Sequence, residues 1–93
     1  MNPAEVEAGL RRAGGAALED VAVVGLAHAE WGSEVVAVLC GDATAEPVLR
    51  EAVGRELAPA KRPRRYVWIA PAAWPRDARG KLNRARLAGL ARA

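Results

Sequence analysis

The spacing of apolar residues changes several times along the chain, and each change marks an expected element. Val6 and Leu10 stand four residues apart, which is the spacing of one helix face. The preceding Asn2-Pro3-Ala4-Glu5 suits a helix start, because Asn2 can cap free N–H groups and proline fits the first helical position. Gly14-Gly15 then ends the predicted helix.

Two valine-rich runs follow, from Asp20 to Leu26 and from Glu34 to Cys40. Consecutive β-branched residues favour strands over helix. The segment between them, His28 to Ser33, contains Gly32, which allows a turn. We therefore expect a β-hairpin with a rather long loop, and we expect Trp31 and Gly32 to be structural.

A second helix is predicted from about Ala45 to Leu57. Four apolar residues recur there at helical spacing: Val48, Leu49, Val53 and Leu57. Thr44 can cap this helix, and Pro47 lies near its beginning.

The remaining chain alternates between short structured and irregular stretches. Tyr66 to Ile69 is aromatic and β-branched, so it should add a third strand. The stretch from Ala70 to Leu82 is interrupted by prolines and a glycine and should be irregular. Asn83 can cap a last helix that carries Leu87 and Leu90.

These elements predict an α+β fold in the order α-β-β-α-β-loop-α. A small three-stranded sheet containing the β-hairpin would pack against two to three helices. Ninety-three residues support one domain, spanning 1–93.

Composition narrows the class of protein further. The lone Cys40 cannot form an internal disulfide, and the N-terminus has no signal-peptide pattern, so a cytoplasmic location is expected. No window approaches the ~20 apolar residues of a membrane span. The net charge is +3, and most Arg and Lys follow position 49, so the second half should face an anion.

Several common site types are missing. The chain has one His, one Cys and one Ser, and their pattern gives no support for a catalytic triad or a metal site. It also lacks a Walker-type loop and a G-x-G-x-x-G pattern. We therefore expect no self-contained hydrolase, no metal ligands and no nucleotide held by those loops.

The conspicuous segment runs from Trp74 to Arg84 and contains Gly80-Lys81. Glycine lets the backbone approach a ligand closely, and lysine places a compact charge on a flexible stem, a combination that suits a phosphate. On spacing alone, a solvated basic loop before a helix is the commoner explanation, since exposed lysine is the norm.

This segment resembles the closing motif of the adenylate-forming superfamily, which includes acyl-CoA synthetases, peptide-synthetase adenylation domains and luciferases. That motif is Pro-Arg, three variable residues, Gly-Lys, two variable residues and Arg, matched here by Pro75, Arg76, Gly80, Lys81 and Arg84. Other stretches resemble the family's C-terminal domain in order and spacing: Asn2 to Glu7, Asp20 to Gly25, Trp31 to Val36, and Leu57 to Pro63. The resemblance covers nearly the whole chain.

The resemblance implies a mobile C-terminal lid domain of an AMP-forming acyl- or aryl-CoA synthetase, with Lys81 as the catalytic side chain for adenylation. Gly80 and Lys61 are then candidate cofactor-binding residues. ATP with Mg, and CoA or the phosphopantetheine of a carrier protein, would serve the complete enzyme. The ATP- and acyl-binding N-terminal domain is absent, so this chain alone should be inactive. A protein acetyltransferase acting on Lys81 is a further expected partner.

One alternative from another class stays open, a small basic nucleic-acid-binding module. Tyr66 and Trp68 stand next to Arg64 and Arg65, and such proteins combine cations with stacking aromatics. The basic connector that contains Lys61 could contact CoA phosphates, but charged loops are more often simply solvated.

Overall fold

The computed structural model describes residues 3–30 and 32–92, apart from the side chain of Ser33. The predicted cap Asn2 and the residue Trp31 lie outside the described residues. Six main elements follow one another: α1 (Pro3–Gly14), β1 (Leu18–His28), β2 (Gly32–Gly41), α2 (Glu46–Glu56), β3 (Arg65–Ile69) and α3 (Arg84–Arg92). The predicted order of helices and strands is confirmed.

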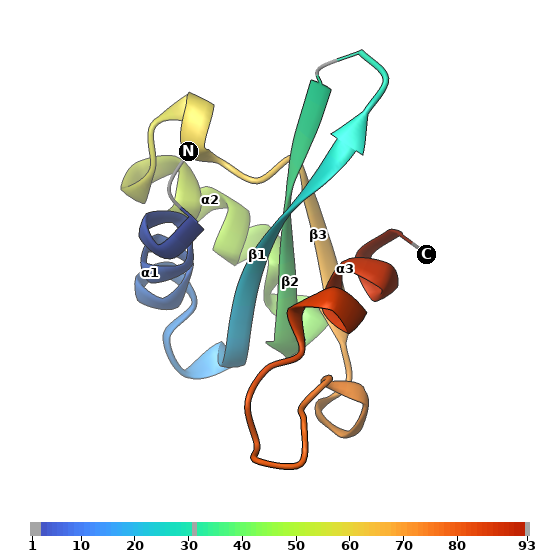
Figure 1. Cartoon of the computed structure of the whole chain (residues 1–93). Helices are drawn as coiled ribbons and strands as arrows, with labels where there is room; N and C mark the ends of the chain where they lie inside the picture. Colours follow the sequence, from blue (N-terminus) through green and yellow to red (C-terminus); the bar gives the residue numbers. More distant parts are fainter. Residues whose placement is uncertain (1–2, 31, 93) are drawn as a thin grey trace.

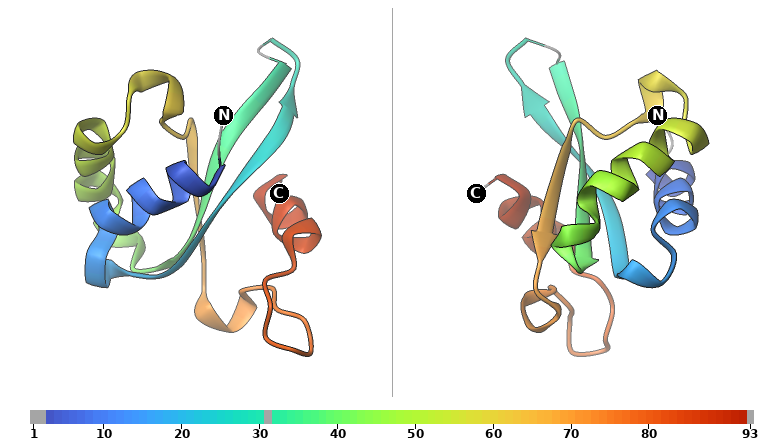
Figure 2. Two further views of the ribbon diagram at one scale, coloured as in Figure 1. Left: turned by 60° about the vertical axis from the view of Figure 1, so that its left-hand side comes forward. Right: turned by 180° about the vertical axis from the view of Figure 1, so that it is seen from behind.

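The three strands form one sheet with β2 in the centre. β1 pairs with β2 antiparallel, as a hairpin must, while β3 pairs with β2 in parallel. A parallel neighbour needs a crossover connection, and α2 supplies it. α1 and α2 cover one face of the sheet, and α3 lies on the other (Figures 1 and 2).

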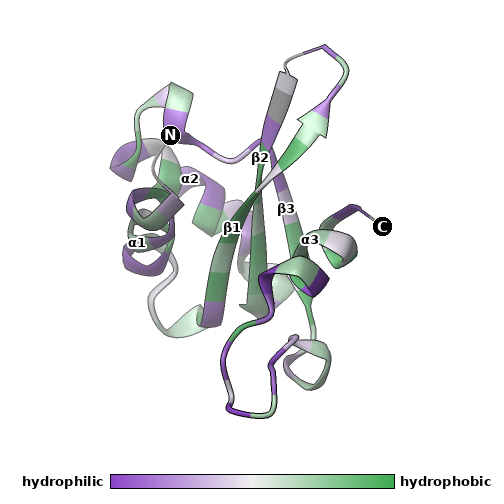
Figure 3. Cartoon of the chain, viewed as in Figure 1, coloured by the Kyte–Doolittle hydropathy of each residue, from purple (hydrophilic) through white to green (hydrophobic). Residues whose placement is uncertain are grey.

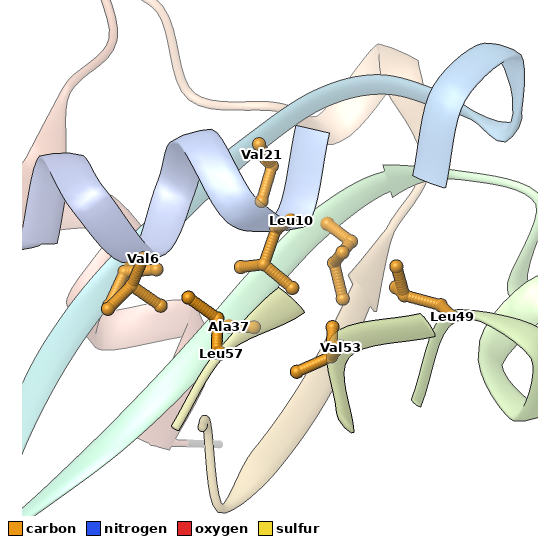
Figure 4. Close-up of a cluster of buried hydrophobic side chains, with 9 residues drawn as sticks. Val6, Leu10, Val21, Ala37, Leu49, Val53 and Leu57 are labelled. Carbon is orange, nitrogen blue, oxygen red and sulfur yellow. The ribbon is translucent and has the colours of Figure 1, made fainter. Parts of the chain in front are cut away.

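Helices on both faces explain why the valine runs are continuous rather than alternating with polar residues. Val21 and Val23 of β1 belong to the cluster under α1 and α2, whereas Ala22 and Val24 belong to the cluster under α3. Figure 4 shows the first cluster, in which Val6, Leu10, Val21, Ala37, Leu49, Val53 and Leu57 are labelled. In Figure 3 the strands carry long apolar stretches, whereas polar and apolar residues are mixed along the helices and the C-terminal loop.

Three details of the helices differ from the sequence prediction. Thr44 does not cap α2; the Asp42 carboxylate instead accepts hydrogen bonds from the Thr44 backbone N (2.9 Å) and Oγ1 (2.6 Å), forming a short turn before the helix. Val48 is 68% exposed, because the buried stripe of α2 runs through Leu49 and Val53. In α3, Ala91 is buried and Leu90 is exposed.

The strands also extend beyond their predicted bounds. β1 continues to His28 and β2 begins at Gly32, so the hairpin connection is shorter than the six-residue loop expected from sequence. Gly32 has φ of +75°, which agrees with its predicted role in the turn.

Candidate functional site

The segment that contains Lys81 is anchored at both ends by the body of the domain. Trp74 and Pro75 are buried before it. After it, the Asn83 backbone N–H donates to the Pro75 carbonyl at 2.9 Å, and Asn83 Oδ1 accepts from the Arg86 backbone N–H at 3.1 Å. The predicted Asn83 cap of α3 is therefore confirmed, and these contacts draw the two ends of the segment together.

Between those anchors the chain forms a tight hairpin turn. Arg76 and Leu82 pair as an antiparallel bridge, and the Asp77 N–H donates to the Lys81 carbonyl at 2.8 Å. The Gly80 N–H donates to the Asp77 carbonyl at 2.9 Å, and Gly80 has φ of +81°. This combination is a short hairpin loop closed by a left-handed glycine.

The Asp77 side chain holds the turn from inside. Its Oδ1 accepts from the Arg79 backbone N–H at 2.8 Å and from the Lys81 backbone N–H at 3.0 Å. Asp and Asn commonly bond in this way to backbone amides just ahead of them. The predicted loop between β3 and α3 is confirmed, and within it residues 76–82 form this ordered turn. An Asp three residues before a Gly was the sequence signal that could have predicted the turn.

The two arginines of the motif point back onto the domain. Arg76 Nη1 donates to the Gly80 carbonyl at 3.1 Å, and its Nη2 donates to Asp20 Oδ2 at 3.0 Å. Arg84 Nη2 lies 3.3 Å from Glu7 Oε1, which also accepts from the Val23 backbone N–H at 3.0 Å. Sequence patterns gave no sign that these carboxylates would be the partners.

Lys81 differs from Arg76 and Arg84, which contact carboxylates of the domain. Its side chain is exposed, and among residues 3–30 and 32–92 its ammonium has no hydrogen-bond or ion-pair partner. At Gly80, an added Cβ would meet nothing within 4 Å, so the surface beside Lys81 is open. The turn thus presents an uncompensated positive charge on a well-defined backbone, which is suited to contact an anion.

Lys61, the third predicted site residue, lies elsewhere. The turn at 59–61 (yellow in Figure 1) stands at the opposite end of the molecule from the turn at 76–82, and both views in Figure 2 agree. Lys61 Nζ contacts Glu5 Oε1 at 2.6 Å. The structure therefore brings Gly80 and Lys81 together but keeps Lys61 apart from them.

The other cations near Lys61 have structural partners. Arg62 donates to the carbonyls of Leu57 and Gly54, both at 2.9 Å, and so satisfies carbonyls at the end of α2. Arg65 contacts Glu34 Oε1 and the Ala91 carbonyl, each at 2.8 Å. These contacts account for Arg62 and Arg65 without an external anion.

The aromatic residues beside this connector are also engaged within the domain. Tyr66 and Trp68 pack against the cluster under α1 and α2, and the Arg50 guanidinium lies 4.1 Å from the centre of the Tyr66 ring. Arg65 reaches the opposite side of the sheet, where α3 lies. The structure therefore places Arg65 on the other side of the sheet from these aromatics, which weakens the nucleic-acid alternative.

Trp68 also shapes the electrostatics of α2. Its Nε1–H donates to Glu46 Oε1 at 2.7 Å, and this hydrogen bond, helped by Arg50, lowers the pKa of Glu46 below its usual value. On the other side of the sheet, burial and the nearby Glu19 and Asp20 raise the pKa of Cys40. Cys40 is thus a buried thiol with little thiolate character, as expected of an inert residue.

The described part of the chain holds neither a metal-binding cluster nor a membrane-spanning helix. In no place do three or more His, Cys, Asp or Glu side chains gather so that they could hold a metal ion. The helices within residues 3–30 and 32–92 are too short or too polar to span a bilayer.

Comparison with known proteins identifies a protein family. The profile of a family described as AMP-binding enzyme C-terminal domain matches residues 5–81. By sequence alone, no curated protein matches the chain.

Solved structures with the same fold come from larger enzymes. A fatty acyl CoA synthetase of Mycobacterium tuberculosis is similar with 31% identity and a TM-score of 0.78, over 91% of this chain and 16% of that one. A benzoate CoA ligase from Burkholderia xenovorans LB400 is similar with 32% identity and a TM-score of 0.70, over 91% and 18% of the two chains. For apo MatB from Rhodopseudomonas palustris the identity is 27% and the TM-score 0.77, over 94% and 17%. The chain spans less than a fifth of the length of each.

Proposed function

The chain belongs to the family of AMP-binding enzyme C-terminal domains, and from this we propose that it is the lid domain of an AMP-forming acyl- or aryl-CoA synthetase. The two neighbours that are more than 30% identical are a fatty acyl CoA synthetase and a benzoate CoA ligase. Their substrates differ, so the proposal names the class of reaction and leaves the acid open. A separate N-terminal adenylation domain would carry the pocket for the acid and for ATP with Mg.

Lys81 is the proposed catalytic residue of the first half-reaction. In that step a carboxylate oxygen of the acid bonds to the α-phosphorus of ATP, and the bond to the departing pyrophosphate breaks. Negative charge builds on the phosphoryl oxygens and on pyrophosphate, and a cation placed there stabilises the transition state more than the ground state. The observation that carries this assignment is the exposed ammonium of Lys81, which has no partner in the described part of the chain and stands on an ordered turn.

Gly80 is proposed to serve the same step, since the absence of a side chain leaves room for a phosphate beside Lys81. The turn at 59–61 lies at the other end of the domain, and its Lys61 is assigned to the second half-reaction instead. There it would contact a phosphate of CoA, or of a carrier protein's phosphopantetheine, after leaving Glu5. A lid that rotates between the two steps would use both ends in turn.

The test measures ATP–pyrophosphate exchange with the chain combined with its N-terminal adenylation domain. Lys81→Ala should lower exchange on the order of 100-fold, the usual effect of losing one contact to developing charge. Arg86→Ala is the matched control, because it removes an exposed cation from the first turn of α3 and should leave exchange intact. Unchanged exchange in Lys81→Ala would refute the catalytic assignment.

The second half-reaction supplies a further control. Lys81→Ala should still transfer the acyl group from a preformed adenylate to CoA, because the charge on Lys81 serves adenylation. Lys61→Ala should show the reverse. Its ATP–pyrophosphate exchange should be normal, and its KM for CoA in the transfer step should be higher. Equal losses in both steps for either variant would contradict this division of roles.

Acetylation of Lys81 by a protein acetyltransferase is part of the same proposal. The side chain is accessible, and acetylation would remove the charge on which adenylation depends. After incubation with acetyl-CoA and such an enzyme, intact-mass analysis should show one added acetyl group, absent in Lys81→Arg. An equal mass shift in Lys81→Arg would place the modification elsewhere.

A further inference from the structure

The guanidinium of Arg76 connects the Lys81 turn to the sheet. Arg76 Nη1 donates to the Gly80 carbonyl at 3.1 Å, and Nη2 donates to Asp20 Oδ2 at 3.0 Å. The Gly80 carbonyl belongs to the peptide group that leads directly into Lys81. Arg76 thus joins the backbone next to Lys81 to a carboxylate on β1, 56 residues away in sequence from Arg76.

Asp20 is itself held firmly. Its Oδ1 accepts from the Val21 backbone N–H at 2.8 Å and from Arg11 Nη2 at 3.1 Å, which leaves Oδ2 for Arg76. The β1–β2 register shifts between Leu18 and Asp20. Such irregularities re-aim a side chain, and they are frequent beside functional sites.

We infer that Asp20 and Arg76 are positioning residues for Lys81: Asp20 fixes Arg76, and the Arg76 fork fixes the turn relative to the sheet. This inference rests on the proposed role of Lys81 in adenylation. Asp77 acts differently, since its contacts with Arg79 and Lys81 shape the turn from within. Without Arg76 these Asp77 bonds would still form, but they would open more easily, and the turn as a whole could pivot on its two ends.

The pair is poorly placed to act through overall stability. The Arg76 side chain is 50% exposed and the Asp20 side chain 21% exposed. Ion pairs near solvent contribute little to global stability. The effect of the pair should therefore be local, on the freedom of residues 76–82 and on where the Lys81 ammonium stands.

Arg76→Lys is the informative variant, because it keeps the charge and removes the fork that reaches two acceptors at once. Arg12→Lys is the matched control. Arg12 Nε pairs with Glu56 Oε2 at 3.0 Å and is similarly exposed, at 58%, but it joins α1 to α2 away from the turn.

The first measurement is amide hydrogen exchange by NMR on the isolated 93-residue chain. In Arg76→Lys, the Gly80 and Lys81 amides should exchange on the order of 10-fold faster, because local opening becomes easier. Amides of β2 should keep their rates, and Arg12→Lys should match the wild type at the turn. Unchanged rates at Gly80 and Lys81, or faster exchange throughout the sheet, would overturn the inference.

The second measurement uses the chain with its N-terminal adenylation domain. Arg76→Lys should lower kcat for ATP–pyrophosphate exchange on the order of 10-fold, since small misplacements of a catalytic group are costly. Acyl transfer from preformed adenylate to CoA should be unchanged. A general loss of folded protein would lower both steps together.

Asp20→Asn completes the test. If Asp20 acts through Arg76, the double variant Asp20→Asn with Arg76→Lys should lose no more kcat than the single variant with the larger loss. A double variant whose loss in kcat equals the product of the two single losses would mean that Asp20 and Arg76 act independently, and would contradict the inference.

The two proposals fail in different ways. If Lys81→Ala keeps full exchange activity, the catalytic role of Lys81 is wrong. If Lys81→Ala is inactive while Arg76→Lys is fully active, Lys81 is catalytic and the positioning role of Arg76 is wrong.

Discussion

At position 80 the backbone itself demands glycine. The φ of +81° is strained for any residue with a Cβ, although the space around Gly80 is open. Gly54, in α2, has equally open surroundings and no such backbone constraint. The two glycines therefore separate conformational strain from steric hindrance.

Gly80→Ala should lower the free energy of unfolding by about 1 kcal/mol, the cost of a left-handed non-glycine residue. Gly54→Ala should raise it by about 0.5 kcal/mol, because alanine restricts the unfolded chain and favours helix. Urea unfolding of both variants measures the difference. Two shifts of the same sign would argue against strain at position 80.

Some residues of the site could be predicted from the sequence. The Gly80-Lys81 pair stood out, because glycine and lysine have distinctive conformational and charge properties. Asp77 was readable in principle, since its turn is local. Asp20 was not, because an acidic residue at a strand start gives no sign of which distant arginine will reach it.

Between elements, the bond from Trp68 to Glu46 ties β3 to the first turn of α2. This hydrogen bond is the main cause of the lowered Glu46 pKa. A lowered carboxyl pKa in the folded state adds stability above the unfolded-state value, and this stability disappears as the pH falls through the folded-state pKa.

Glu46→Gln should therefore lower the free energy of unfolding at pH 7 by about 1 kcal/mol or less, given that the side chain is partly solvated. The difference from wild type should shrink toward pH 3, as the pH falls toward and through the lowered pKa of Glu46. Urea unfolding at both pH values measures it. Glu51→Gln, which loses only an exposed pair with Arg55, is the control and should show little effect at either pH. A Glu46→Gln deficit that is as large at pH 3 as at pH 7 would exclude the charge as its cause.

The caps illustrate what the sequence says about elements. Asn83 was predicted correctly because its bond to Arg86 is local and its competitors are few. Thr44 was not, because Asp42 stands two residues earlier and its carboxylate is the stronger acceptor. Neighbouring polar side chains can form alternative short-range hydrogen bonds. The sequence shows which residues are candidates but not which of these bonds forms.

Over the whole molecule, a 93-residue domain has a free energy of unfolding of about 5–14 kcal/mol, so single core contacts matter. Leu39 is fully buried on the central strand, whereas Leu90 in α3 is 38% exposed. Replacing each leucine by alanine makes the same chemical change at a buried position and at an exposed one.

Leu39→Ala should lower the free energy of unfolding by about 3–5 kcal/mol, from lost burial and the cavity left behind. Leu90→Ala should cost about 1 kcal/mol or less, since much of its side chain already meets water. Denaturant midpoints for the two variants test the contrast. Similar costs would contradict the difference in burial between Leu39 and Leu90.

The sequence by itself determined the elements, their order, and the Gly80-Lys81 motif, because periodicity and turn chemistry act over a few residues. Only the tertiary structure decided that β3 runs parallel to β2 with helices on both faces. It also decided that Lys61 pairs with Glu5 at one end while Arg76 pairs with Asp20 near Lys81. Both ion pairs join residues 56 positions apart. Contacts at that range depend on how the sheet, helices and turn pack, and local patterns do not encode them.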